Sequence, residues 1–258
     1  MPVALVTIAL VVAQASSGHY GLAMVRAVPI GGAYRTASVT EVPSVAIPIP
    51  PIPQKVGVGI REVEHLGPQI SAASAAVIDV ASGAVLFGKQ PYVVRPLASI
   101  TKLVTALTII GDHPDWNARI AIIPSDIPPE GHTILRPGDL VMTRNLFTAM
   151  LVRSDNGAAR ALGRGHEAVE GWFRGAAAQT ARALGLFALR VVEPTGLAPE
   201  NRGTAVDVAR LLVAAMEHHE IADRLEMAQA NIPVERQQQP TVLPIQSTNL
   251  LLHGPSRT

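Results

Sequence analysis

Apolar positions follow a helical period through the middle of the chain and form short strand-like runs on either side of it. Two such runs, 73–80 and 84–87, are joined through Ala81-Ser82-Gly83 and predict a β-hairpin. Helical patterns follow it at 96–110, 143–152, 157–163, 166–185 and 204–218, with short extended pieces at 119–123 and 189–192. Beyond 218 the pattern is mostly extended, and we expect prolines to break it at Pro233, Pro240 and Pro244. The order of hairpin, helical block and further strands predicts an α+β fold.

Two helix starts carry local signals. Thr143 is a plausible cap for its helix, and Thr204 with Asp207 at the third helical position resembles a capping box. The first hairpin carries a different expectation. A hairpin is only marginally stable without neighbouring strands, so 73–87 is expected to leave an open hydrogen-bonding edge.

Residues 1–15 have the composition of a secretory signal peptide. About 12 residues from Pro2 to Ala13 are almost wholly apolar, which is too short to span a bilayer. Ala13-Gln14-Ala15 offers small residues for cleavage, so the mature chain is expected to begin at Ser16. The first basic residue is Arg26, which leaves a buried N-terminal helix as the alternative. Export predicts a location in the periplasm or on the outer face of the cytoplasmic membrane.

Residues 16–60 are interpreted as a proline-rich linker. The segment 47–53 alternates isoleucine and proline and predicts an extended spacer of the polyproline type. Periodic patterning begins near Gln69, so 61–258 is expected to form a single folded domain.

Composition excludes several classes of protein. Hydrophobic residues make up 48% of the chain, which is ample for a core, and the net charge is only +1 without a basic cluster, so no nucleic-acid partner is expected. The chain has no cysteine, which excludes disulfides, thiol catalysis and thiolate metal sites. His218-His219-Glu220 is the densest histidine group, and adjacent helical residues point in different directions, so it is interpreted as solvated surface. No metal and no cofactor are expected.

Ser99 and Lys102 form the first candidate catalytic pair. Pro96 suits the first turn of a helix, which places Ser99 near the helix start and Lys102 one turn further along the same face. A neutral lysine amine can take the proton of such a serine, and the serine's own backbone N–H can face an oxyanion. The plain alternative is a solvated serine beside a surface lysine.

Ser154 and Asn156 form the second candidate group, in the turn that closes the 143–152 helix. They supply a hydroxyl that can relay a proton and a carboxamide that can hold a substrate amide. Alone, Ser-Asp-Asn is as often a helix-ending turn. After a Ser-x-x-Lys motif, however, it completes two of the three motifs of serine acyltransferases that react with penicillin.

Longer stretches around these motifs extend the similarity. They are Val94-Arg-Pro-Leu-Ala-Ser-Ile-Thr-Lys-Leu-Val-Thr-Ala, Met150-Leu-Val-Arg-Ser-Asp-Asn-Gly-Ala-Ala, Val192-Glu-Pro-Thr-Gly-Leu and Ser247-Thr-Asn. Over about residues 70–252 the chain resembles the low-molecular-mass penicillin-binding proteins, which are D-alanyl-D-alanine carboxypeptidases and endopeptidases. Its motif sequences are most similar to those of the penicillin-binding protein 7-like branch. The resemblance implies a β-lactamase/transpeptidase-like fold, with a helical block packed on an antiparallel sheet.

The resemblance also implies roles for individual residues. Ser99 would attack the penultimate D-Ala carbonyl of a peptidoglycan stem peptide, with Lys102 as the base. Ser154 would pass the proton on, and Asn156 would orient the substrate amide and touch the lysine. Asp155 matches a variable position and is given no chemistry. The implied partners are peptidoglycan peptides, with β-lactam antibiotics as covalent inhibitors.

The chain departs from the family at its third motif, Lys-Thr-Gly. Arg257-Thr258 lies too close to Asn249 for the usual spacing, so we expect a chain cut short before that motif. Two alternatives therefore stay open. One is an inactive relic that binds penicillin or glycopeptide weakly. The other is a class A-like β-lactamase, for which Glu193 is the candidate carboxylate.

Overall fold

The computed structural model describes residues 7–14, 20–24, 70–164 and 171–253. The strands are β1 (Thr7–Gln14), β2 (Tyr20–Met24), β3 (Ser74–Asp79), β4 (Val85–Lys89), β5 (Arg95–Pro96), β6 (Arg119–Ala121), β7 (Leu140–Met142), β8 (Arg202–Gly203), β9 (Gln229–Arg236) and β10 (Gln239–Gln246). The α-helices are α1 (Thr101–Gly111), α2 (Thr143–Val152), α3 (Asn156–Arg164), α4 (Trp172–Ala183), α5 (Ala205–Met216) and α6 (His219–Leu225). Short 3₁₀ helices are η1 (Ala98–Ile100), η2 (Pro124–Asp126) and η3 (Leu250–His253).

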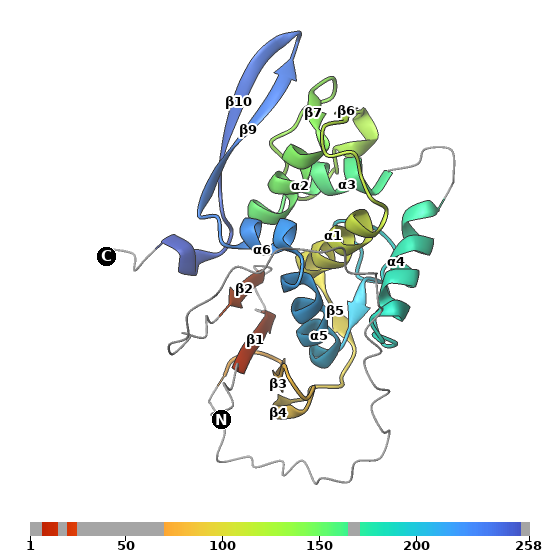
Figure 1. Ribbon diagram of the computed structural model, residues 1–258, viewed down its shortest axis with the longest axis vertical. Helices are drawn as coiled ribbons and strands as arrows, with labels where there is room; N and C mark the ends of the chain where they lie inside the picture. Colours follow the sequence, from red (N-terminus) through yellow and green to blue (C-terminus); the bar gives the residue numbers. More distant parts are fainter. Residues whose placement is uncertain (1–6, 15–19, 25–69, 165–170, 254–258) are drawn as a thin grey trace, which may run out of the picture.

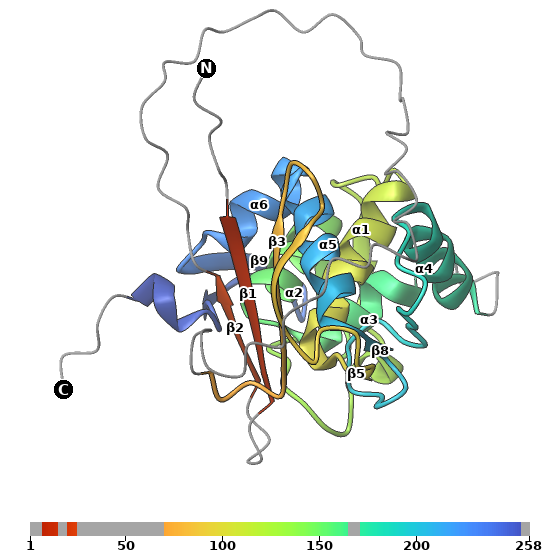
Figure 2. The same cartoon turned by 90° about the horizontal axis from the view of Figure 1, so that it is seen from below.

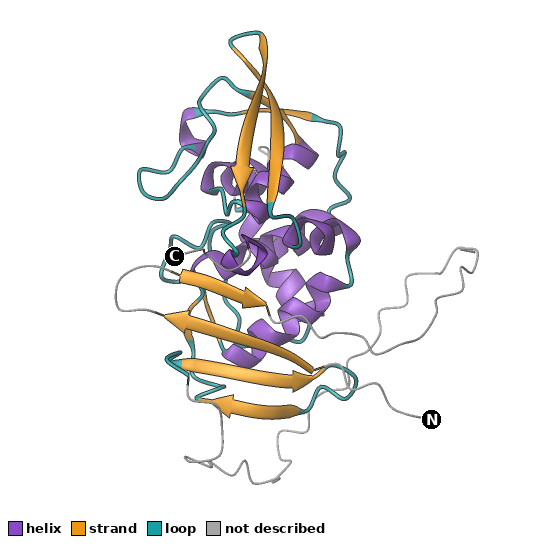
Figure 3. Ribbon diagram, turned by 90° about the vertical axis from the view of Figure 1, so that its left-hand side faces the viewer, coloured by secondary structure: helices purple, strands orange, loops and turns teal. Residues whose placement is uncertain are grey.

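A block of helices separates two antiparallel sheets. One sheet has the strand order β2-β1-β3-β4 and the other has the order β10-β9-β7-β6, while β5 and β8 form a small pair beside the helices. The β9–β10 hairpin extends away from the helices at one end of the molecule, and the β1–β4 sheet lies at the other end (Figures 1 and 3). The predicted α+β class is confirmed.

Helix α1 is the central element of the helical block. Its residues from Thr101 to Ile109 are all buried, and it contacts α2, α3, α4 and α5. A helix that is apolar or threonine-rich on every side is stable only when other elements surround it. The side chains at the start of α1 are therefore fixed from several directions.

The predicted hairpin is present as β3 and β4, and the expectation of an open edge on it is wrong for β3 but holds for β4, which is an outer strand of its sheet. Strand β1 pairs antiparallel with β3 from Thr7 opposite Asp79 to Val12 opposite Ser74, and β2 pairs in turn with β1 (Figure 2). The backbone groups of β3 therefore have partners on both sides, and the open edge of the hairpin lies on β4.

Strands β1 and β2 lie in the ranges that the sequence assigns to a signal peptide and a linker. At 20–24 the chain forms strand β2, and the rest of 16–60, with the proline-rich segment 47–53, lies outside the described residues. Cleavage before Ser16 stays a prediction. None of the helices in the described ranges is long and apolar enough to cross a membrane.

The prolines after 218 do not interrupt the sheet. Pro233 pairs with Val242 within β9–β10, and Pro244 pairs with Asn231. Strand β9 meets β7 only at Leu140, so most of the hairpin has a free edge on each side, where a missing N–H is tolerated. The prediction of broken strands is therefore wrong.

Local helix signals have a mixed outcome. The capping box at Thr204 is confirmed, because its side chain accepts from the N–H of Asp207. Thr143 is not a cap: Met142 precedes the helix, and the Thr143 hydroxyl donates to the carbonyl of Ala118. Helix α6 was not predicted. Residues 166–170 of the predicted 166–185 helix lie outside the described residues, and within the remainder α4 spans Trp172–Ala183.

Candidate active site

Ser99 lies in η1, immediately before α1, rather than inside one continuous helix that begins at Pro96. The residue before it, Ala98, has a positive φ of 47°, an unusual value for a residue with a side chain. Lys102 lies in the first turn of α1, and its Nζ atom is 3.3 Å from Ser99 Oγ. The structure therefore brings the predicted serine and lysine within contact.

Lys102 is buried, with only 3% of its surface exposed. Its Nζ atom donates to the side-chain oxygen of Asn156 at 2.8 Å and to the backbone carbonyl of Thr195 at 2.7 Å. Burial disfavours the charged amine and lowers the pKa of Lys102 from 10.5 to about 8, while the negative charges of Glu193 and Asp155 act in the opposite direction. The lysine is thus held close to the range in which it can act as a base.

The Ser154-Asp155-Asn156 turn lies opposite Ser99. Ser154 has a φ of +59°, and its hydroxyl is 3.0 Å from Ser99 Oγ. Asn156 begins α3, and its backbone N–H donates to the carbonyl of His132. All four residues predicted for the site, Ser99, Lys102, Ser154 and Asn156, are therefore in one contact network.

Asp155, which has no predicted chemical role, has a structural one. It is buried, and its carboxylate accepts from the Thr133 hydroxyl, the Ile134 N–H and the Ala158 N–H at 2.8 Å each. The carboxylate thereby stabilises the first turn of α3 and fixes the loop that precedes β7. Asn156 is positioned by the residue next to it.

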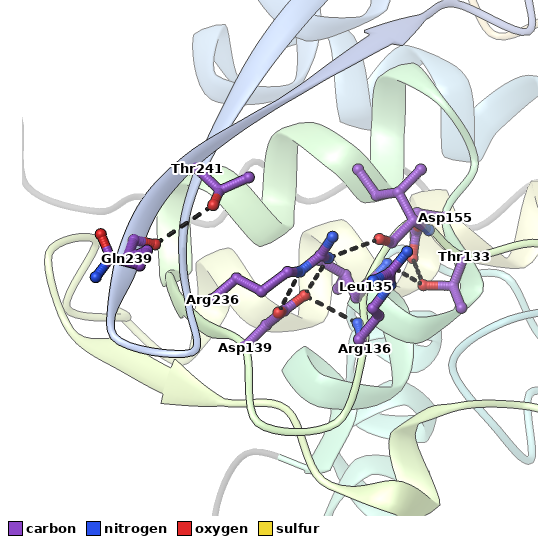
Figure 4. Close-up of polar contacts among 9 residues, drawn as sticks. Thr133, Leu135, Arg136, Asp139, Asp155, Arg236, Gln239 and Thr241 are labelled. Carbon is purple, nitrogen blue, oxygen red and sulfur yellow. Dashed lines mark hydrogen bonds and ion pairs between the residues drawn. The ribbon is translucent and has the colours of Figure 1, made fainter.

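An ion pair connects the β9–β10 hairpin to that loop (Figure 4). The guanidinium of Arg236 pairs with the buried carboxylate of Asp139 at 2.6 Å and donates to the carbonyl of Ile134. Asp139 also accepts from the N–H of Arg136. The hairpin is therefore linked to the segment that Asp155 holds.

Thr195 is the contact that sequence reasoning missed. Its segment, Val192-Glu-Pro-Thr-Gly-Leu, was noted only as part of a family resemblance, and the atom that meets Lys102 is a backbone carbonyl. Gly196 follows with a φ of +88°, and a Cβ there would lie 1.9 Å from the carbonyl oxygen of Ala98. A glycine between the extended piece at 189–192 and the helix at 204–218 is the signal that could have indicated this close approach.

A cavity of about 150 Å³ adjoins these residues. Ser99, Lys102 and Ser154 line it together with mainly apolar side chains, among them Leu103 and Val208. Within the described ranges no group of three or more metal-ligating side chains occurs. The nucleophile thus borders a small, largely apolar space.

Comparisons with known proteins show the family and the fold. The model of peptidase family S11, D-alanyl-D-alanine carboxypeptidase, matches residues 61–253. The chain is 32% identical over 168 residues to a D-alanyl-D-alanine endopeptidase of Pseudomonas aeruginosa, covering 64% of this chain and 52% of that protein. It is 28% identical over 211 residues to a D-alanyl-D-alanine endopeptidase of Escherichia coli, covering 80% and 66%.

Solved structures support the fold. A variant of the Streptomyces K15 DD-transpeptidase superposes with a TM-score of 0.67 at 22% identity, covering 74% of this chain and 79% of the other. A D-alanyl-D-alanine carboxypeptidase of Mycobacterium tuberculosis gives a TM-score of 0.64 at 25% identity, covering 72% and 70%. The fold is that of the penicillin-reactive peptidases, as predicted. The chain belongs to the D-alanyl-D-alanine carboxypeptidase family, and it spans about half to two thirds of the length of the curated relatives named above.

Proposed function

We propose that this protein is a serine-type D-alanyl-D-alanine peptidase that cleaves peptidoglycan stem peptides through an acyl-enzyme on Ser99. The observation that carries the proposal is the set of contacts around the Lys102 amine. Its two shortest contacts, to Asn156 Oδ1 and to the Thr195 carbonyl, are both with atoms that can only accept a hydrogen bond.

This arrangement determines what a neutral Lys102 can do. A neutral amine has two N–H groups and one lone pair, and the two acceptors use both N–H groups. The lone pair is then available to the third neighbour, the hydroxyl of Ser99 at 3.3 Å. With a pKa of about 8, roughly a tenth of the lysine is neutral at pH 7. The site therefore selects the serine proton as the one that Lys102 removes.

The reaction follows from these contacts. Lys102 takes the Ser99 proton as Oγ attacks the D-Ala carbonyl, and the first-turn N–H of Ser99 faces the developing oxyanion. Ser154, 3.0 Å from Ser99 Oγ, donates its hydroxyl proton to the departing amine and receives the proton that Lys102 took from Ser99. The peptide C–N bond breaks and an ester to Ser99 remains, which water hydrolyses to restore the serine.

The bond that is cleaved defines two versions of the activity. The relatives from P. aeruginosa and E. coli are named endopeptidases, whereas the family description is that of a carboxypeptidase. We favour the endopeptidase, acting on cross-links between stem peptides. β-Lactams would acylate the same serine, and an enzyme with this substrate would work outside the cytoplasmic membrane.

A class A-like β-lactamase is not favoured. That activity needs a carboxylate that activates water, and the Glu193 carboxylate accepts hydrogen bonds from its own loop instead. Because Glu193 is the candidate carboxylate for this role, its engagement in these hydrogen bonds weighs against a β-lactamase.

Purified muropeptides test the proposal. The protein is incubated with a linear pentapeptide monomer and with a D-Ala cross-linked dimer, and products are identified by mass spectrometry, with Ser99→Ala as the control. Release of D-Ala from the monomer indicates the carboxypeptidase, and conversion of dimer to monomers indicates the endopeptidase. If neither product forms with the wild-type protein, the proposal fails and the relic interpretation is correct.

A further inference from the structure

The segment from Glu193 to Ala198 is folded around one carboxylate. Oε2 of Glu193 accepts from the N–H of Thr195 at 2.8 Å and from its hydroxyl at 2.6 Å. Oε1 accepts from the N–H of Gly196 at 2.6 Å and from that of Ala198 at 3.3 Å. A carboxylate has about four lone-pair sites, so these four donors of the loop already match its capacity.

Asn201 holds the carboxylate from the other side. This residue is completely buried, and its Nδ2 donates to Oε1 of Glu193 at 2.7 Å and to the Glu193 carbonyl at 3.0 Å. Its Oδ1 accepts from the N–H of Val192 at 2.7 Å. The backbone carbonyl of Asn201 accepts from the N–H of Leu97, just before η1. Asn201 thus connects the loop to the segment that leads into the nucleophile.

Two residues of this loop, Thr195 and Gly196, lie against Lys102 and Ala98. The carbonyl of Thr195 accepts from Lys102 at 2.7 Å, and Gly196 lies so close to Ala98 that a Cβ could not be accommodated. Neither contact involves the Glu193 side chain itself. Both depend on the loop conformation that its carboxylate maintains.

We propose that Glu193 is a positioning residue for the peptidase reaction, because its carboxylate holds the 193–198 loop so that Thr195 directs Lys102 toward Ser99. This inference rests on the proposed function. The carboxylate acts through Thr195 and does not contact the reacting atoms. Its negative charge adds a second effect, because it raises the pKa of Lys102 against the larger effect of burial.

The composition of the chain offers a direct readout of this effect. Only three lysines occur, Lys55, Lys89 and Lys102, so lysine labelled with ¹³C at Cε gives three signals, and Lys102→Met identifies one of them. The titration midpoint of Lys102 can then be followed by NMR without any catalytic turnover. The rate of acylation by a fluorescent penicillin, measured above that midpoint, reports positioning.

Glu193→Gln keeps the shape of the side chain but replaces one acceptor oxygen by a donor that faces N–H groups. We expect the Lys102 midpoint to move to lower pH and acylation to slow about tenfold or more, since displacements near 1 Å can cost a hundredfold. Glu193→Asp keeps the charge but shortens the reach, so acylation slows while the midpoint moves less. Glu235→Gln is the matched control, because Glu235 pairs with Arg119 at the surface, and it should change neither quantity.

The outcomes separate the two proposals. If wild-type protein shows no adduct at Ser99, the proposed function fails, while the NMR midpoint still tests the influence of Glu193 on Lys102. If Glu193→Gln has the wild-type midpoint and the wild-type acylation rate, the positioning role is wrong. If the Gln variant does not fold, the Asp variant decides: wild-type acylation by that variant overturns the proposal.

Discussion

The buried lysine makes the stability of the protein depend on pH in a defined window. Lys102 has a pKa of about 8 in the folded protein and an ordinary value of 10.5 when exposed in the unfolded chain. Below pH 8 it is protonated in both states, so the full cost of burying the charge is present. Between about 8 and 10.5 the unfolded chain binds more protons, and the free energy of unfolding therefore rises with pH.

The magnitude follows from the two pKa values. The difference between 10.5 and about 8 corresponds to about 3 kcal/mol, of which most is gained between pH 7 and pH 10. Other groups also titrate there, so the comparison needs Lys102→Met, which keeps an unbranched side chain one atom shorter and removes the amine. We expect the stability of wild type relative to this variant to rise by between about 2 and 3 kcal/mol over that range.

Urea unfolding at half-unit pH intervals measures this difference. Both proteins are followed by circular dichroism, and the free energies of unfolding are compared at each pH. Curves for wild type and Lys102→Met that run parallel from pH 7 to pH 10 would refute the reasoning, because they would show that the lysine has the same pKa in both states.

Three further predictions concern the elements that support the site. Gly196→Ala should slow β-lactam acylation by about a hundredfold while the protein stays folded, because the new methyl group displaces the backbone of Ala98, just before the nucleophile. Stopped-flow kinetics measure the acylation rate, and a thermal melt shows whether the variant is folded. Asp139→Asn should lower the free energy of unfolding by about 2–3 kcal/mol, because Arg236 loses its charged partner. Chemical unfolding measures this loss, and a loss below about 0.5 kcal/mol would contradict the prediction. Replacing Gln237 and Gln238 by Asn-Gly should add about 1 kcal/mol, because both have positive φ in a two-residue hairpin turn; an unchanged unfolding midpoint would show that the turn has another conformation.

The features that the sequence could predict have local signals. The capping box at Thr204 needs only residues three apart, and Lys102 follows Ser99 by one helical turn. The contact between Lys102 and Asn156 joins residues 54 positions apart, and it was reached through the family resemblance rather than through spacing. Contacts between residues a few positions apart can therefore be predicted from spacing, whereas contacts between residues distant in the sequence need the resemblance to a known family.

The features that the sequence could not predict depend on packing or on the backbone. Helix α6 has only seven residues, and Ile221, which is completely buried, is its one buried side chain. The pairing of β1 with β3 depends on an edge that exists only in the folded sheet. The Thr195 carbonyl has no side-chain signature at all, because every residue has a carbonyl.

The central claim is that Ser99 is acylated with Lys102 acting as a neutral base. Mass mapping after reaction with penicillin, combined with the rate of adduct formation in Lys102→Arg, tests it most directly. The account predicts a single adduct on Ser99 and a loss of about 10²–10⁴-fold in rate for the arginine variant, because arginine keeps the charge but cannot give up its proton. An adduct that persists in Ser99→Ala, or an arginine variant that reacts within a few-fold of wild type, would contradict it.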